Sequence, residues 1–296
     1  MPNLLQRLVG RDKTEQPALD DLNIVIAVVS DTHINSTVAL CTPTVILDDG
    51  GTYEASNAQR WIWHNWAEQF WPWVGQRARA VGAKKIYGIF NGDIADSDKH
   101  DGVQVITRNT TSIQRMAEQT LRPALDVIDE PIFVRGTEAH VGKSASIEEK
   151  IAEDLGGVRD PTNDTWSWWY FTGEFAGVQV DAAHHPETSG RRPWTAKAAA
   201  ARQSAITAAH YAKRGELPPH VALFGHVHYF ADSGMDTMPR TFFLWPWQLT
   251  TAFGHRLGGG GPGVRPLGGM ILICRDGQVS MEYQQYEPAR RQRWQG

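Results

Sequence analysis

Aspartate and histidine side chains follow five separate apolar segments of this sequence. Each segment reads as a strand, and each stops at a residue type that binds metal ions. In α/β sheets, functional groups collect just beyond the carboxyl ends of the strands. We therefore expect these side chains to converge on one site. They are Asp31 and His33, Asp93, His140, His184 with His185, and His226 with His228.

The residue types indicate a site for divalent metal ions. Carboxylate oxygens and imidazole nitrogens together suit Mn, Fe, Zn or Ni. A buried cluster of carboxylates and imidazoles without a cation would be costly to desolvate. The sequence therefore predicts a metal centre built from these side chains.

The spacing within the motifs fits two neighbouring ions. On an extended segment, residues i and i+2 point the same way, so Asp31 and His33 would reach one metal together. His226 and His228 would serve two adjacent metals. Asp93 is a single carboxylate that would bridge both ions, as a two-metal hydrolytic site requires. We expect two divalent metal ions with Asp93 between them.

Buried strands and intervening helices must position these side chains. The β-branched run at 23–29 is typical of a strand buried on both faces. Apolar residues at helical spacing make the Trp-rich stretch 57–82 a helix that lies mainly in the core, with a kink or break at Pro72. The order of elements predicts an α/β layered fold with either one mixed sheet or two facing sheets. Expected strands are 23–29, 85–90, 131–135, 166–171, 178–183, 221–224, 241–245, 269–275 and 278–285, and expected helices are 57–82, 108–129, 144–155 and 194–214.

The chain of 296 residues is long enough for one large domain with short appendages. Residues 1–22 are polar and broken by a proline, so we expect a lead-in there. The domain itself is expected over 23–286, with an insertion at 34–82 that contains the Trp-rich helix. Residues 287–296 are expected to form a C-terminal tail.

Charge and composition bound the function. The net charge of -4 provides no globally basic surface for nucleic acid, although a local patch remains open. Two widely separated cysteines, Cys41 and Cys274, indicate a reducing compartment without a disulfide framework. No stretch approaches the roughly 20 apolar residues that span a bilayer, and the N-terminus does not read as a signal peptide. We therefore expect a cytoplasmic protein without a membrane partner.

The ordered motifs resemble the calcineurin-like metallophosphoesterases. The resemblance covers about residues 24–230, and it implies a layered β-sandwich flanked by helices. It also implies hydrolysis of a phosphate ester by water activated between two metals. The residues that carry it are Asp31-Thr32-His33, Gly92-Asp93, Gly136 to His140, His184-His185-Pro186 and Gly225-His226-Val227-His228.

The resemblance assigns a role to each motif. His140 would sit beside the leaving oxygen as a general acid or phosphate donor. His185 is expected to support the neighbouring ligand rather than bind metal itself. The implied first metal is held by Asp31, His33 and His228, the bridge is Asp93, and the second metal is held by His184 and His226.

One motif departs from the family pattern. The family usually reads Gly-Asn-His followed by an acidic residue, and the Asn is a metal ligand. This chain reads Gly136-Thr137-Glu138-Ala139-His140. We expect His140 to be the retained histidine. Glu138 would either replace the Asn as a stronger oxygen ligand or point away and leave the second metal weakly held.

The expected substrate is a phosphodiester in a nucleotide or nucleic acid. Asp93-Ile94-Ala95-Asp96 lacks the Arg-Gly that follows this motif in protein phosphatases, and Asp96 itself reads as ordinary loop polarity. Arg191 and Arg192 would either clamp a phosphate or lie in a solvated loop. The alternatives are a phosphomonoesterase or protein phosphatase, and a non-catalytic metal-binding scaffold protein of a phage.

The variant motif at 136–140 also resembles uncharacterised phosphoesterases of tailed phages and prophages, as do the segments 48–53, 190–195 and 247–254. That softer resemblance implies the cytoplasm of a bacterium or a phage-infected host cell.

Overall fold

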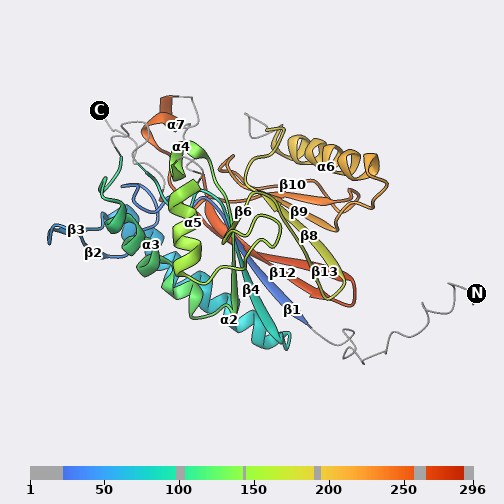
Figure 1. Cartoon of the computed structure of the whole chain (residues 1–296), viewed down its shortest axis with the longest axis horizontal. Coiled ribbons are helices and arrows are strands. Elements are labelled where there is room, and N and C mark those ends of the chain that lie inside the picture. Colours follow the sequence, from blue (N-terminus) through green and yellow to red (C-terminus); the bar gives the residue numbers. More distant parts are fainter. Residues whose placement is uncertain (1–22, 98–103, 143–144, 190–194, 257–264, 290–296) are drawn as a thin grey trace, which may run out of the picture.

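Two β-sheets stack face to face, and helices cover both outer faces (Figure 1). The computed structural model describes residues 23–97, 104–142, 145–189, 195–256 and 265–289. The predictions for 1–22, for Arg191 and Arg192, and for most of the tail lie outside these residues. No described helix is long and apolar enough to cross a lipid bilayer.

The first sheet has six strands in the order β13-β12-β1-β4-β5-β6. The strands β1, β4, β5 and β6 run parallel to one another, and β12 and β13 add an antiparallel edge. Because the parallel strands share a direction, their carboxyl ends meet at one edge of the sheet. The strands are β1 (Ile24–Val29), β4 (Lys85–Asn91), β5 (Glu130–Val134), β6 (Ser167–Trp168), β12 (Leu267–Arg275) and β13 (Gln278–Tyr286).

The second sheet has five strands in the order β10-β11-β9-β8-β7. Its three central strands are parallel, and β7 and β10 pair antiparallel at the two edges. The strands are β7 (Phe171–Phe175), β8 (Val178–Ala183), β9 (Val221–Phe224), β10 (Ala231–Asp232) and β11 (Arg240–Phe243).

The alternation of side chains along β1 shows how the layers are held. Val25, Ala27 and Val29 face the helices, whereas Ile26 and Val28 face the second sheet. All five are buried, as the β-branched run predicted, because successive strand side chains point to opposite faces. Removing this apolar area from water on both faces, at about 25 cal/mol per Å², favours the stacked arrangement.

Helices cover the two outer faces unequally. The first sheet is covered by α1 (Asn57–Trp63), η3 (His64–Phe70), α2 (Trp71–Ala80), α3 (Thr110–Leu125) and α5 (Ser146–Asp154). The second sheet is covered by α6 (Ala196–Lys213), seen at the upper right of Figure 1. Two short helices, α4 (Glu138–Val141) and α7 (Ala252–Arg256), complete the described helices.

The Trp-rich stretch is a helix whose middle is a π-helix. Trp66 and Trp71 are fully buried, which bears out the core interpretation. The helix was predicted to kink or break at Pro72. The irregularity lies instead just before this proline, in the π-helical segment η3. Proline has no N–H to donate, and the chain widens its hydrogen-bond spacing so that the Trp71 N–H reaches the carbonyl of Trp66.

The predicted α/β layered fold is confirmed, in its version with two facing sheets. The segment predicted as one strand at 166–171 is divided: β6 belongs to the first sheet and β7 to the second. The first part of the predicted insertion at 34–82 contains a hairpin of β2 (Thr44–Ile46) and β3 (Thr52–Glu54).

Candidate metal centre

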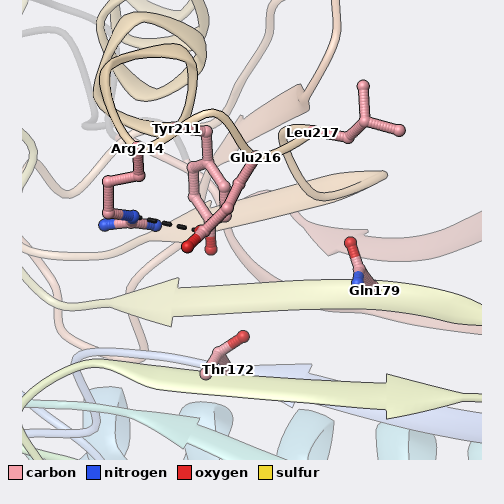
Figure 2. Close-up of a pocket in the computed structure, with 6 residues that line it drawn as sticks. All are labelled: Thr172, Gln179, Tyr211, Arg214, Glu216 and Leu217. Carbon is pink, nitrogen blue, oxygen red and sulfur yellow. Dashed lines mark hydrogen bonds and ion pairs between the residues drawn. The ribbon is translucent and has the colours of Figure 1, made fainter.

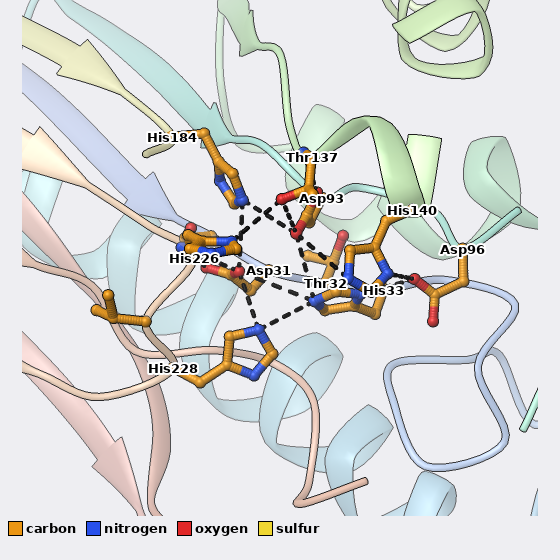
Figure 3. A network of polar contacts seen from close by, with 12 residues as sticks. Asp31, Thr32, His33, Asp93, Asp96, Thr137, His140, His184, His226 and His228 are labelled. Carbon is orange, nitrogen blue, oxygen red and sulfur yellow. Dashed lines mark hydrogen bonds and ion pairs between the residues drawn. The ribbon is translucent and has the colours of Figure 1, made fainter. Parts of the chain in front are cut away.

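Loops at the carboxyl ends of five parallel strands bring the predicted side chains together (Figure 3). Three of these strands, β1, β4 and β5, belong to the first sheet, and β8 and β9 belong to the second. The donor atoms form four overlapping groups, each with its atoms within 4.8 Å of one another. The groups are Asp31/His33/His228, Asp31/Asp93/His184, His33/Asp93/His140 and His184/His185/His226.

The first group is deeply placed. Asp31 and His33 are fully buried. Nε2 of His228 lies 3.1 Å from Oδ1 of Asp31 and 3.1 Å from Nε2 of His33. Three donor atoms from two sheets thus face a common centre, as expected for one metal position.

His184 is oriented by the backbone behind it. Its Nδ1 lies 2.7 Å from the carbonyl oxygen of Asn91. A carbonyl only accepts hydrogen bonds, so Nδ1 carries the hydrogen and Nε2 faces the cluster. Nε2 lies 3.0 Å from Oδ2 of Asp93, but the approach is not along a hydrogen-bond direction, and among the described residues this buried nitrogen has no hydrogen-bond partner.

Asp93 is held by the neighbouring loop, which starts at Gly136. The Thr137 N–H donates to Oδ1 of Asp93 at 2.5 Å, and the Thr137 hydroxyl lies 3.2 Å from Oδ2. A Cβ on Gly136 would lie 2.2 Å from the Asp93 nitrogen, so only glycine fits. Glu148 links the loop after β4 to the loop after β5. Its buried carboxylate accepts hydrogen bonds from the N–H groups of Ile94, at 2.9 Å, and Gly136, at 2.6 Å.

Thr137, and not Glu138, places its side chain beside the donor atoms, where the resembled family has its Asn. The Thr137 hydroxyl lies 3.0 Å from Nε2 of His185 and 3.1 Å from Nδ1 of His226. Glu138 is exposed and belongs to none of the four groups. Of the two alternatives from the sequence, the geometry favours the one in which Glu138 does not replace the Asn.

His140 lies at the mouth of the site with its side chain 38% exposed. Its Nδ1 is 2.8 Å from Oδ1 of Asp96, and its Nε2 is 4.0 Å from Oδ2 of Asp93. Oδ1 of Asp96 also lies 2.7 Å from Nδ1 of His33. Asp96 is therefore part of the site, and its interpretation as plain loop polarity was wrong.

Five of the clustered residues have a left-handed backbone. Their φ angles are 53° at Asp31, 44° at His33, 49° at Asp93, 67° at His226 and 53° at His228. Asp31 and His33 thus converge with left-handed backbone at both residues, and the extended geometry proposed for them was wrong. Such conformations cost of order 1–3 kcal/mol each and cluster at functional sites.

The electrostatics of the cluster fit cations. Burial acts to raise the pKa of Asp31, but His228 and His184 outweigh it and hold this pKa well below the usual range. Burial likewise opposes the charge on His184, but Asp93 and Asp31 raise its pKa to about 9. The buried carboxylates thus draw protons onto nearby imidazoles, and divalent ions would replace those protons.

The two more exposed histidines, His185 and His226, have lowered pKa values, in contrast to His184. Partial burial, together with the charge of His184, lowers the pKa of His185. Partial burial, followed by the charges of His184 and His185, lowers the pKa of His226 to about 4. Both rings are therefore neutral at pH 7, the form that binds metals.

The two arginines expected to clamp a phosphate, Arg191 and Arg192, lie outside the described residues.

A cavity of about 600 Å³ lies away from the donor cluster, between β7, β8 and the end of α6. It is lined by Thr172, Gln179, Tyr211, Arg214, Glu216 and Leu217 (Figure 2). Its lining shares no residue with the four groups of donor atoms.

No protein-family model matches the sequence, and no curated protein matches it. Solved structures with a similar arrangement include Vps29 from Entamoeba histolytica complexed with Zn²⁺, at 9% identity and a TM-score of 0.38, over 88% of this chain and 98% of that one. Vps29 from Cryptosporidium parvum gives 11% identity and a TM-score of 0.36, over 90% and 100%. A dimetal phosphatase from Danio rerio gives 10% identity and a TM-score of 0.42, over 90% and 99%. Likeness at this level assigns neither a metal nor an activity to the chain.

Proposed function

We propose that this protein is a metallophosphoesterase that hydrolyses phosphodiester bonds of a nucleotide or nucleic acid. The observation that carries the proposal is the overlap of the four donor groups around Asp31 and Asp93. Two buried carboxylates surrounded by imidazoles from both sheets form a compact donor set for two neighbouring divalent ions. The resemblance of the ordered motifs to the calcineurin-like family supports the same conclusion.

The donor groups divide into two metal positions. Asp31, His33 and His228 would hold the first ion, and Asp93 would be shared. His184 and His226 would hold the second ion. When bound, two ions of the Mn, Fe, Zn or Ni type would supply Lewis acidity toward the phosphoryl group and activate water for attack.

The residues around the ions have their own tasks. Asp96 holds Nδ1 of His140 at 2.8 Å, which leaves Nε2 on the side of the cluster. In its protonated form, His140 would donate a proton to the leaving oxygen. Thr137, which lies beside Asp93, holds the bridging carboxylate in place through its N–H and hydroxyl groups.

A protein phosphatase is disfavoured, because Asp96 is followed by Ser97 rather than by the Arg-Gly that follows this motif in those enzymes. A phosphomonoesterase is the nearest alternative. The proposed setting is the cytoplasm of a bacterium or a phage-infected cell.

The test is hydrolysis by purified protein loaded with Mn²⁺, Ni²⁺, Zn²⁺ or Mg²⁺. We expect bis-p-nitrophenyl phosphate to be hydrolysed faster than p-nitrophenyl phosphate. Asp93→Asn should lose both metal content and most activity, because the shared charge is removed. Faster hydrolysis of the monoester would replace the diester assignment. Metal binding without any hydrolysis would instead support a non-catalytic scaffold.

A further inference from the structure

The second metal position contains one more imidazole than the motifs require. His184, His185 and His226 form one group whose ring centroids are 4.9, 5.5 and 4.4 Å apart. Sequence reasoning gave His185 only a supporting place. Its nitrogen instead belongs to the same cluster of donor atoms as the two motif histidines.

The Thr137 hydroxyl shows where these nitrogens point. The oxygen lies 3.0 Å from Nε2 of His185, 3.1 Å from Nδ1 of His226 and 3.2 Å from Oδ2 of Asp93. Three groups from three strands therefore converge on one point. A threonine hydroxyl is a neutral oxygen, and it occupies the chain position where the resembled family has its Asn.

We infer that His185 is a third imidazole ligand of the second metal position and makes that position selective for Zn²⁺ over Mn²⁺. The inference rests on the proposed two-metal function. The second position would then combine one carboxylate, from Asp93, with three imidazoles. The first position combines two carboxylates, from Asp31 and Asp93, with the imidazoles of His33 and His228.

Ligand chemistry gives the two positions different preferences. Imidazole suits Zn²⁺, Ni²⁺ and Cu²⁺, whereas carboxylate and water suit Mn²⁺ and Mg²⁺. His185 and His226 are also exposed, whereas the ligands of the first position are buried or half-buried. The zinc ion at the second position should therefore exchange with free ions in solution faster than the ion at the first position.

The test is a metal competition on metal-free protein. Wild-type protein would be dialysed against Mn²⁺ in large excess over Zn²⁺, and bound metals would be measured by mass spectrometry. We expect one tightly bound Zn²⁺ per chain beside one Mn²⁺. Titration with Co²⁺ gives a second readout, because the visible absorption of Co²⁺ reports its ligand set.

Two variants separate the role of His185 from general damage. His185→Ala should weaken zinc binding at the second position at least about tenfold and change the Co²⁺ spectrum. His185→Asn provides an amide oxygen and should raise the share of Mn²⁺. His64→Ala is the matched control, since His64 is exposed and paired with Glu68 at 2.9 Å on a distant helix, and it should change neither readout.

Failure of this inference is distinct from failure of the proposed function. If His185→Ala keeps wild-type zinc affinity and spectrum, His185 is not a ligand, although hydrolysis by wild-type protein would still support the phosphoesterase. If wild-type protein binds two ions with no preference between Zn²⁺ and Mn²⁺, the selectivity is overturned. If wild-type protein binds no metal, the proposed function fails as well.

Discussion

Oδ1 of Asp96 lies 2.7 Å from Nδ1 of His33, a fully buried imidazole of the candidate metal centre. The same oxygen lies 2.8 Å from Nδ1 of His140. One carboxylate thus orients two imidazoles that come from different loops. Partners of this kind fix the tautomer of a ligand and raise its basicity.

Asp96→Asn should weaken metal binding about 10- to 100-fold and lower kcat/KM. The amide keeps the size of the side chain but removes the negative charge of the carboxylate that contacts both imidazoles. Metal affinity would be measured by competition with a chelator, and activity on a diester substrate. Asp236→Asn, at an exposed aspartate, is the control. Wild-type metal affinity in Asp96→Asn would show that the carboxylate does not support the ligands.

Glu148 gives the metal-free protein a pH-dependent stability. Burial, followed by the charge of Asp93, raises the pKa of Glu148 to about 7, above the 4.5 of an ordinary glutamate. A raised pKa means that the folded state binds the proton more tightly than the unfolded state. The stabilisation is therefore complete below pH 4.5 and is lost as the pH rises through 7.

The comparison with Glu148→Gln isolates this effect, because glutamine does not titrate. In metal-free protein, the free energy of unfolding of the wild type minus that of the variant should fall by about 2 kcal/mol between pH 5 and pH 8. Urea denaturation at several pH values measures it. A difference that stays constant with pH would mean that Glu148 is ionised throughout this range. Bound metal should reduce the effect, since cations near Asp93 favour the ionised carboxylate.

Gly136→Ala tests the close approach of the two loops. The added Cβ would lie 2.2 Å from the Asp93 nitrogen and 2.3 Å from its Oδ1, which are distances that atoms do not adopt. The loop must shift, so we expect loss of metal binding and a destabilisation of at least about 1 kcal/mol. Thermal unfolding and metal content measure the two effects. Gly215→Ala also adds a Cβ to a glycine outside the helices and strands. Its Cβ would have no atom within 4 Å, although Gly215, unlike Gly136, has a positive φ. This control should leave metal content unchanged.

Sequence reasoning predicted the layered fold and the convergence of the polar side chains well. Buried strands such as β1 carry a continuous apolar run that leaves little choice of structure. Each strand ends where an aspartate or histidine follows, so the shared direction of the strands places these residues at one edge. The ordered motifs then supplied their grouping.

Several details of the candidate metal centre were beyond the sequence. The left-handed backbone at Asp31 and His33 cannot be read from residue types, because these conformations are held by contacts with distant segments. One such contact is the hydrogen bond from the His33 N–H to the carbonyl of Asp93 at 2.9 Å. Asp96 looked like any polar loop residue, since its partners lie far along the chain. The pair His184-His185 was visible, but only the approach of Thr137 shows that the second ring also faces the site.

His140 has two chemical roles open to it, and one variant distinguishes them. Its Nε2 lies 4.0 Å from Oδ2 of Asp93, which is close enough for a ligand and also for a proton donor beside the ions. We expect the proton-donor role, because the imidazole lies at the mouth of the site with its side chain 38% exposed and its Nδ1 held by Asp96. His140→Ala should then lower kcat by about 100-fold while metal content stays near that of the wild type.

The dependence on the leaving group makes this test specific. A proton donor matters most when the leaving oxygen is a strong base, so the loss in His140→Ala should be larger for an alkyl diester than for a p-nitrophenyl diester. Both rates and the metal content would be measured on the same preparations. Equal losses for the two substrates, together with loss of one metal ion, would reassign His140 as a ligand. Wild-type rates on both substrates would remove His140 from the catalytic centre.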